Sequence, residues 1–342
     1  QKKSVFVSCF LLLLVLTLAL LIICYTLSSS SLSWPEKYSL YERQQRFFNQ
    51  LNLSILHPLF HEHPKQITLN KTTQSPTTPP TVPPTGVEYH QAYPRNYHFI
   101  MDHTEACKHK TPFLVLMVPV APHNVEARDA IRQTWGNKNV VQGEVVLTFF
   151  MLGSSGSDFL DTYLNLTIKT MVIMEWLATH CPTAAYAMKV DSDMFLNIDN
   201  LVIMLKKPDI PKQNYLTGLL MWNRPVVRSK DSKWYVPEEM YPETTYPPYT
   251  LGMGYVFSND LPEKFVEASK TIKPFNIEDA YIGMCMKKLE LSLSSPPDPS
   301  QFKSYNWGYS RCEFSKVITY ILGSSEELVK YWTDLKKPEP PC

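Results

Sequence analysis

The sequence predicts an α/β fold in which helices cover both faces of a mostly parallel sheet. Three short apolar runs, 112–120, 145–152 and 186–190, have the length and composition of strands that are buried on both faces. Between them lie two longer stretches with helical patterning, 124–136 and 160–181. Strands that alternate with helices form crossover units, which place the strands side by side and parallel. In such sheets ligands bind at the carboxyl ends of the strands.

The N-terminal part of the chain carries a different pattern. Residues 4–27 are an uncharged apolar run after Lys2 and Lys3, long enough to cross a bilayer as a helix. A signal peptide is the alternative, but its apolar core would be shorter and a small-residue cleavage site would follow it. The lysines place residues 1–3 in the cytoplasm and the remainder in a lumen, which is a type II topology. The chain opens on Gln, so we expect a truncated cytoplasmic tail.

Residues 28–106 are expected to form a lumenal stem, and residues 107–342 a folded domain. The stretch 74–85 is rich in proline and threonine, and this composition favours an extended spacer without a core. Three sequons predict N-glycosylation, at Asn52, Asn70 and Asn165. Cys9 and Cys24 lie within the apolar run, and an oxidising lumen would pair most of the other five cysteines.

Charge excludes one class of partner. The formal net charge is +1, and no basic stripe stands out, which argues against a nucleic acid. The oligomeric state is left open by the sequence.

Two aspartates directly follow the predicted strand 186–190. Alternate side chains of a strand share a face, so Asp191 and Asp193 can converge on one ligand. Carboxylates at a strand's end suit a hard divalent cation that carries phosphate oxygens. The triplet alone is weak support for a metal site, because a solvated loop with a capping aspartate produces the same pattern.

Several segments together resemble the glycosyltransferase family of β1,3-galactosyltransferases and β1,3-N-acetylglucosaminyltransferases. In chain order they are EARDAIRQTWG at 126–136, DTYLNLTIKT at 161–170, KVDSD at 189–193, KDSKWY at 230–235, GMGYVFS at 252–258 and EDAYIG at 278–283. The resemblance covers nearly all of residues 107–335, and six segments in one order are far more specific than any one of them. It implies a GT-A fold, a UDP-sugar donor, a manganese ion and residence in the Golgi membrane.

The resemblance also implies which residues bind the donor. They are Arg128, Arg132, Trp135, Lys189, Asp191, Gly252 and Gly254. The two arginines share one helix face, for which a solvated face is the alternative. Trp135 either covers part of the nucleotide pocket or packs under the helix end. The two glycines would let the chain approach donor or acceptor closely, with a plain turn as the alternative.

Acceptor binding is predicted for Lys233, Trp234 and Tyr235, within the irregular aromatic and proline-rich stretch 215–249. Ordinary packing of an irregular segment is the alternative for any one of these aromatic residues.

For the chemistry, the resemblance implies that Asp279 is the general base, with Glu278 in support. Both acids begin a predicted helix, where capping is the other reason for an acid. Asp193 is predicted to bind the metal directly, and Asp191 to reach the ribose or a metal-bound water. The metal would stabilise the charge that develops on the departing diphosphate.

Four positions depart from the family pattern. Ile321 stands where a histidine is expected to complete the metal site, which weakens or removes that site. Thr250 replaces a cysteine and Met253 a small polar residue. The link 153–158 is shorter than the family's by roughly twenty residues. The resemblance further implies the disulfides Cys107–Cys181 and Cys285–Cys312.

We therefore predict a type II Golgi enzyme that transfers galactose from UDP-galactose, with inversion, to the 3-hydroxyl of a terminal N-acetylhexosamine, N-acetylglucosamine foremost, on glycoproteins or glycolipids. Galactose is favoured because segments 161–170 and 230–235 look closer to the galactosyltransferase branch. Transfer of N-acetylglucosamine is one alternative. A glycan-binding pseudoenzyme is the second, supported by Ile321 and the short link. A metal-independent transferase is the third, in which Arg132 and Lys189 neutralise the diphosphate.

Overall fold

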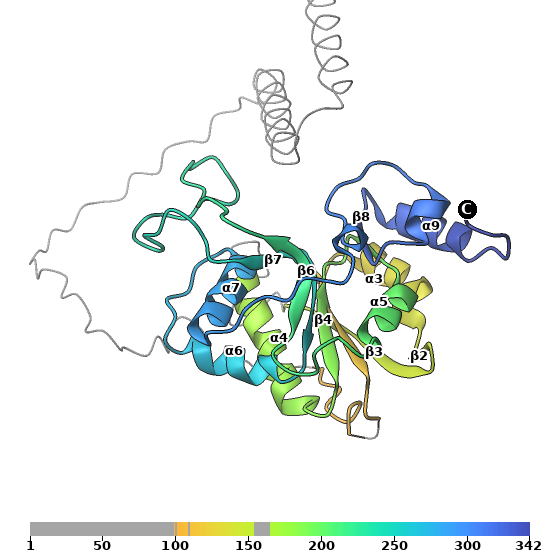
Figure 1. The fold of residues 1–342 in the computed structure, drawn as a ribbon, viewed down its shortest axis with the longest axis horizontal. Helices are drawn as coiled ribbons and strands as arrows, with labels where there is room; N and C mark the ends of the chain where they lie inside the picture. Colours follow the sequence, from red (N-terminus) through yellow and green to blue (C-terminus); the bar gives the residue numbers. More distant parts are fainter. Residues whose placement is uncertain (1–98, 100, 109, 154–164) are drawn as a thin grey trace, which may run out of the picture. The chain divides into compact units, whose positions relative to one another are not determined.

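The computed structural model describes residues 99, 101–108, 110–153 and 165–342 (Figure 1), all within the compact unit Thr81–Cys342. The predicted membrane span, the stem up to residue 98, the sequons at Asn52 and Asn70, and all but the first residue of the short link lie outside the described residues. Among the residues that are described, none of the helices has both the length and the apolar character needed to cross a membrane.

The centre of the described part is a six-stranded mixed sheet with the strand order β2-β3-β1-β4-β7-β6. Its strands are β1 (Leu114–Pro119), β2 (Val140–Val141), β3 (Glu144–Met151), β4 (Tyr186–Val190), β6 (Leu216–Met221) and β7 (Tyr249–Ser258). β1, β3 and β4 are the three strands predicted from the apolar runs, and β1 pairs with both of the others in parallel.

The prediction of a mostly parallel sheet was wrong for the outer strands. Within the described sheet, β2 pairs with β3, β4 with β7, and β6 with β7, all in antiparallel fashion. Parallel neighbours need a crossover connection, usually a helix. The chain between β6 and β7 is instead the irregular segment 222–248, which returns in the opposite direction (Figure 1).

Helices cover both faces of the sheet, as predicted (Figure 1). They are α3 (Val125–Gln133), α4 (Leu166–His180), α5 (Ile198–Leu205), α6 (Leu261–Ser269), α7 (Glu278–Lys288), α8 (Arg311–Phe314) and α9 (Ser325–Leu335), with the short 3₁₀ helices η2 (Trp135–Asn137) and η4 (Pro299–Gln301). The core cluster on one face includes side chains of α4, α6 and α7, and the cluster on the other includes α3, α5 and α9. α3 begins where the sequence indicated, because the Asn124 side chain accepts a hydrogen bond from the Ala127 amide at 3.3 Å.

A second, two-stranded sheet was not predicted. β5 (Met194–Leu196) follows Asp193 directly and pairs antiparallel with β8 (Thr319–Ile321). Each strand has three residues, too few for a periodic signal in the sequence. The Leu322 amide donates to the Asp193 carbonyl at 3.0 Å, so this small sheet fixes the chain at the C-terminal end of the Asp-x-Asp segment.

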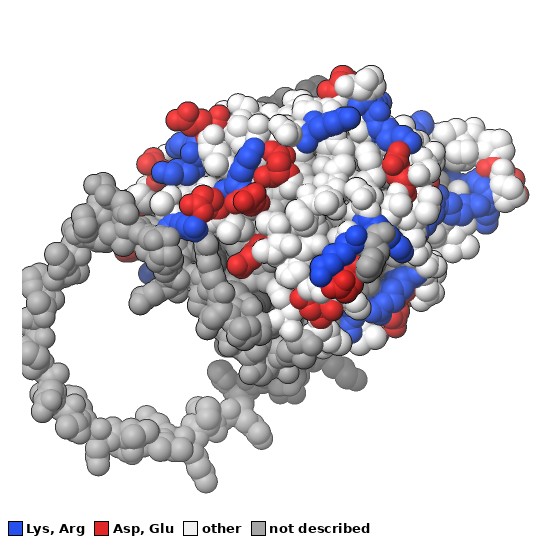
Figure 2. All heavy atoms as spheres, turned by 90° about the horizontal axis from the view of Figure 1, so that it is seen from below, with Lys and Arg blue, Asp and Glu red and all other residues white. Residues whose placement is uncertain are grey.

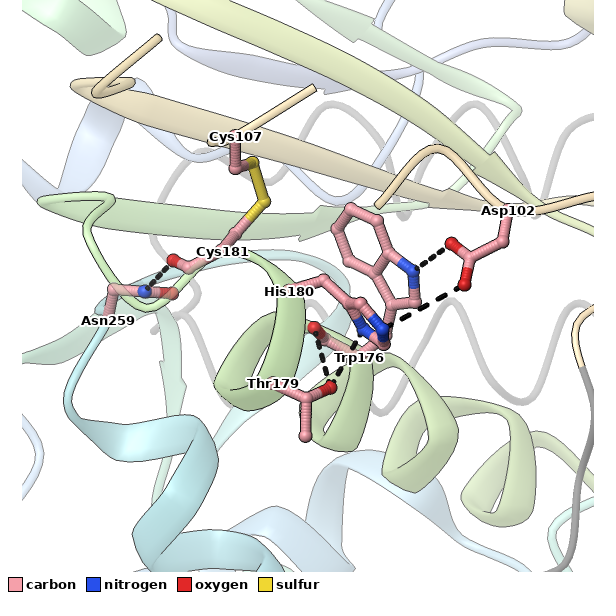
Figure 3. Close-up of a disulfide and its surroundings, with 7 residues drawn as sticks. All are labelled: Asp102, Cys107, Trp176, Thr179, His180, Cys181 and Asn259. Carbon is pink, nitrogen blue, oxygen red and sulfur yellow. Dashed lines mark hydrogen bonds and ion pairs between the residues drawn. A yellow bond between two sulfur atoms is a disulfide. The ribbon is translucent and has the colours of Figure 1, made fainter. Parts of the chain in front are cut away.

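The disulfide Cys107–Cys181 is confirmed, and it fastens the segment before β1 to the end of α4 (Figure 3). Asp102 strengthens this attachment, since it accepts from the Trp176 indole at 2.9 Å and lies 3.8 Å from the His180 ring nitrogen. Residues shortly before the predicted domain boundary at Cys107 thus pack on the folded domain.

The predicted disulfide Cys285–Cys312 is wrong, because Cys312 is bonded to Cys342. The Arg311 guanidinium donates to the carbonyls of Lys337 and Glu339, both at 2.7 Å, which holds the C-terminal segment beside α8. Cys285 is a free thiol in the core side of α7, and burial raises its pKa.

Charged side chains of both signs are interspersed on the face shown in Figure 2. No continuous basic stripe crosses this face of the described residues, in keeping with a formal net charge of +1.

Candidate active site

The carboxyl edge of the sheet brings together the ends of β4, β7 and α7. Val190, the last residue of β4, pairs with Gly254, so the first part of β7 extends beyond that edge. The Asp191 amide donates to the Met253 carbonyl at 2.9 Å. The Gly252 amide donates to the Asp279 carboxylate, also at 2.9 Å. Asp191 and Asp279 therefore lie on either side of one short piece of β7.

A buried ion-pair network joins β4 to α7 at this place. Lys189 is only 3 % exposed, and its ammonium lies 2.7 Å from Asp191 and 3.4 Å from Glu278. It also donates to the Gly252 carbonyl. The other oxygen of Glu278 accepts from the Tyr255 hydroxyl at 2.6 Å.

The neighbouring carboxylates keep Lys189 protonated. Burial by itself lowers the pKa of Lys189, but the charges of Asp191 and Glu278 outweigh it and raise that pKa above the ordinary value. All three acceptors of its ammonium belong to the protein. The structure thus gives Lys189 a positioning role in the site, and this arrangement does not favour the direct diphosphate contact that the sequence predicted.

Asp279 is a half-buried carboxylate whose pKa lies near neutral pH. Burial and then the charge of Glu278 raise the pKa of Asp279 to about 7, against hydrogen bonds from the amides of Gly252 and Ala280 and the charge of Lys189. The Ala280 amide donates to it at 2.8 Å, so Asp279 also stabilises the first turn of α7. A carboxylate with this pKa can take up a proton at neutral pH.

The residues around Asp193 provide few ligands for a metal ion. Asp193 is exposed, Asp191 is paired with Lys189, and Ile321 lies opposite Met194, next to Asp193. Nowhere in the described ranges do three His, Cys, Asp or Glu side chains form a group that could hold a metal. Burial and the charge of Asp191 raise the pKa of Asp193, against the charges of Lys189 and Lys233. A divalent cation at Asp193 would have to take most of its ligands from phosphate and water.

The two glycines of β7 make room for protein atoms. A Cβ on Gly252 would lie 2.9 Å from the Glu278 carboxylate and 3.2 Å from the Asp279 Cβ. A Cβ on Gly254 would meet the end of Met188 at 3.2 Å and the Thr319 methyl at 3.4 Å. We conclude that Gly252 lets α7 approach β7 and so places both acids.

Gly252→Ala is expected to lower kcat by about 10²-fold, because displacing Asp279, the predicted base, by a fraction of an ångström misaligns the proton transfer. The measurement is steady-state turnover in the reaction that the sequence resemblance implies, with thermal unfolding to confirm the fold. Gly254→Ala is the matched control, and its loss should be clearly smaller since the flexible Met188 side chain can move. Equal losses in the two variants would contradict this role for Gly252.

The predicted donor residues of α3 have protein partners. Arg128 donates to the carbonyls of Ala121 and Pro122 at 3.2 and 3.0 Å, which fastens the loop between β1 and α3. Arg132 is exposed, pairs with Asp129 at 2.9 Å and lies 4.9 Å above the Phe150 ring.

Trp135 is fully buried, and its indole donates to the Met194 carbonyl at 3.2 Å. Of its two predicted roles the structure therefore favours packing, because no face of the indole is open to a nucleotide. The bond to Met194 supports the chain directly after Asp193.

The predicted acceptor residues lie in the segment between β6 and β7, near the same edge. The Lys233 ammonium lies 4.8 Å above the half-exposed Trp234 ring, and its charge partly offsets the raised pKa of Asp193. The Tyr235 carbonyl accepts from the Asn276 side chain at 3.2 Å, shortly before α7 begins. Asn276 thus links the acceptor segment to the acids.

Sequence reasoning did not assign roles to Asn276 or Tyr255. For Tyr255 the signal was its place directly after Gly254 in the glycine segment. Asn165, the predicted glycosylation site within the described residues, is the N-cap residue of α4. Thr167 of that sequon is buried and donates to the Phe275 carbonyl at 2.8 Å.

The comparisons with known proteins identify the family of this chain. Residues 156–297 match the family model described as Galactosyltransferase. Beta-1,3-galactosyltransferase 2 of Homo sapiens is 42 % identical over 270 residues, which cover 72 % of this chain and 64 % of that protein. Beta-1,3-galactosyltransferase 1 of Mus musculus is 36 % identical over 263 residues, which cover 71 % of this chain and 79 % of that protein. The chain thus spans 64 % of the length of the first relative.

Solved structures are more distant. A glycosyltransferase involved in the glycosylation of the major capsid of PBCV-1 matches with a TM-score of 0.38 and 12 % identity, over 65 % of this chain and all of that one. A Drosophila β1,4-galactosyltransferase 7 mutant in complex with manganese, UDP-Gal and xylobiose matches with a TM-score of 0.31 and 12 % identity, over 54 % of this chain and 65 % of that one. These scores are too low to bear on the site. By its sequence relatives, the chain belongs to the β1,3-galactosyltransferase family.

Proposed function

We propose that the protein is an inverting glycosyltransferase that transfers galactose from UDP-galactose to the 3-hydroxyl of a terminal N-acetylhexosamine, N-acetylglucosamine foremost, on glycoprotein or glycolipid glycans. The observation that carries the proposal is Asp279, a half-buried carboxylate whose pKa is about 7 and whose position is fixed by the Gly252 amide. The printed names of the relatives support galactose and the β1,3 linkage.

In the proposed reaction Asp279 accepts the proton of the acceptor's 3-hydroxyl. The acceptor oxygen forms a bond to the anomeric carbon of galactose while the bond from that carbon to the UDP oxygen breaks. The electron pair of that bond leaves on the diphosphate. Because attack comes from the face opposite UDP, an α-linked donor gives a β-linked product.

Manganese fits the site through Asp193, with Asp191 beside it. When bound, a divalent cation would neutralise negative charge on the diphosphate. The chain's own contribution is to position these carboxylates: the Lys189 ammonium pairs with Asp191 at 2.7 Å, and the Leu322 amide donates to the Asp193 carbonyl.

The proposed setting is the Golgi membrane, with residues 4–27 as a type II anchor, residues 28–106 as the stem, and the catalytic domain in the lumen. We further propose that this domain has a GT-A fold.

The test is UDP release by the full chain in detergent with an N-acetylglucosamine glycoside as acceptor. UDP-galactose should be turned over at least about tenfold faster than UDP-N-acetylglucosamine, a difference of about 1.4 kcal/mol in transition-state binding. A chelator should abolish turnover, and manganese should restore it.

The outcomes separate the alternatives. Faster turnover of UDP-N-acetylglucosamine would show that the donor sugar is N-acetylglucosamine instead of galactose. Activity that survives the chelator would support a metal-independent transferase. A folded protein without turnover of either donor, on several acceptors, would support the glycan-binding alternative. Ile321 beside Asp193 is the observation that favours that alternative.

A further inference from the structure

The tryptophans of the described residues fall into two groups. Three are buried in the core, at 8 % exposure or less: Trp135, Trp176 and Trp332. Three are strongly exposed: Trp222 at 54 %, Trp234 at 46 % and Trp307 at 73 %. Trp222 follows the end of β6 and Trp234 belongs to the predicted acceptor segment. Trp307, the most exposed of them, has no role in the site described above.

Trp307 lies on a segment that runs along β8 toward Asp193. Phe302 bridges Thr319 in parallel, and the Lys303 amide donates to the Thr319 carbonyl at 2.9 Å. β8 itself runs to Ile321, after which the Leu322 amide donates to Asp193. β8 and the segment between β6 and β7 both lie toward the upper end of the sheet in Figure 1. The segment with Trp307 therefore lies beside β8, the strand that pairs with β5 directly after Asp193.

The protein fixes the backbone that carries this exposed indole. The Trp307 amide donates to the Tyr320 hydroxyl, which in turn donates to the Gly308 carbonyl at 3.0 Å. Gly308 has a φ of +90°, a conformation that glycine adopts without strain. A side chain on a fixed backbone loses less conformational entropy when a ligand covers it than one on a mobile loop.

The next residues anchor the other end of the segment. The Tyr309 ring stacks on Tyr331 of α9, with centroids 4.2 Å apart, and its hydroxyl donates to Asp334 at 2.6 Å. The loop is thus fixed to β8 on one side and to α9 on the other.

The geometry of the rings suits a saccharide. The Tyr305 and Trp307 rings are nearly perpendicular, at 89°, with centroids 5.5 Å apart. A sugar ring has an apolar face of C–H groups and a polar rim of hydroxyls. Tryptophan and tyrosine match this pattern, because each has an apolar face and a polar group at its edge. The apolar face of a sugar could cover the indole, which is 73 % exposed, while the sugar hydroxyls stay hydrated.

We infer that Trp307, with Tyr305 beside it, forms a second saccharide-binding position that holds a sugar unit of the acceptor beyond the one that receives galactose. The inference rests on the proposed function, since it extends the acceptor of that reaction. It adds that the protein distinguishes oligosaccharides from single sugars.

The experiment compares two acceptors with the full chain: an N-acetylglucosamine monosaccharide glycoside and a neutral tetrasaccharide that ends in the same residue. Trp307→Ala should raise KM for the tetrasaccharide about tenfold, as expected for an exposed aromatic anchor. Its kcat, its KM for the monosaccharide and its KM for UDP-galactose should stay within about twofold, because only the added contact is lost. Trp307→Phe, which keeps an aromatic face, should lose at most about threefold.

Ile203→Ala is the matched control, because Ile203 is an apolar side chain of α5 with 48 % exposure that the site does not use. It should change neither acceptor's KM. Equal losses of Trp307→Ala on both acceptors, a raised KM for UDP-galactose, or no loss at all would each overturn the inference.

A direct measurement of oligosaccharide binding tests this inference independently of the proposed reaction. Isothermal titration of the tetrasaccharide without donor should show binding that Trp307→Ala weakens about tenfold. If that difference appears while no donor is turned over, the saccharide position stands and the proposed reaction fails. If galactose is transferred while the variant binds and reacts like wild type, the reaction stands and the saccharide position fails.

Discussion

Asp279→Asn is expected to lower kcat by about 10²- to 10⁴-fold, the range for loss of a general base. Asparagine has nearly the same shape but cannot take up the acceptor proton. Dissociation constants for UDP-galactose and acceptor should change little, so the loss should appear in kcat. Asp260→Asn is a suitable control, because Asp260 is a partly buried carboxylate that bonds Lys264 and the Asn214 amide instead of the candidate site. A variant at Asp279 that keeps more than a tenth of the wild-type kcat would contradict its role as base.

The same residue sets a pH dependence. Because Asp279 must be deprotonated to act and its pKa is about 7, kcat/KM should rise about tenfold per pH unit below that value and level off above it. The folded protein holds this proton up to about pH 7, whereas an unfolded aspartate releases it near 3.8. The unprotonated state is thus disfavoured in the fold, and Asp279 contributes a loss of stability as pH rises between these values. A rate that is flat from pH 5.5 to 8 would contradict the assignment.

Lys189→Met is expected to lower the free energy of unfolding by about 3 kcal/mol, because it leaves the buried Glu278 and the partly exposed Asp191 without their partner. For a domain of this size that is roughly 6–12 °C in Tm. Lys264→Met is the control: the Lys264 side chain is 40 % exposed and its ammonium pairs with Asp260 at the surface, so the expected loss is at most about 1 kcal/mol. Thermal unfolding of the two variants at pH 7 measures the difference.

Lys189→Met should also move the pH profile. The charge of Lys189 lowers the pKa of Asp279, so its removal should shift the rising limb of kcat/KM to higher pH. The pKa of Lys189 is raised above 10.5, so the stability it contributes is fully present below that pH and is lost only as pH rises through the higher folded value. A limb that shifts to lower pH, or a Tm equal to that of wild type, would show that the network does not act as described.

Much of the sheet could be predicted from the sequence, because β1, β3 and β4 are buried on both faces and form continuous apolar runs. β6 and β7 could not, since they flank an aromatic and proline-rich stretch without a periodic pattern, and their partners decide their direction. β5 and β8 are far apart in the chain, and each is stable only through the other and the core beneath them.

Of the candidate site, too, one part could be predicted from the sequence and another could not. The motifs predicted one site from Asp191, Gly252 and Asp279, and the structure brings these residues together, while their roles stay predictions. The partner of Lys189 could not be read from the sequence, since Glu278 is 89 positions away and the contact exists only after α7 packs on β7. Cysteine spacing likewise leaves connectivity open, which is why Cys312 was paired with Cys285 instead of Cys342.

The most direct measurement is the proton NMR spectrum of the first product formed from UDP-galactose and an N-acetylglucosamine glycoside by the full chain with manganese. Inversion with Asp279 as base predicts a galactosyl anomeric proton with the large coupling constant of a β-linkage, and a correlation to position 3 of the acceptor. An α-linked first product, or a linkage to another hydroxyl, would contradict the proposed chemistry.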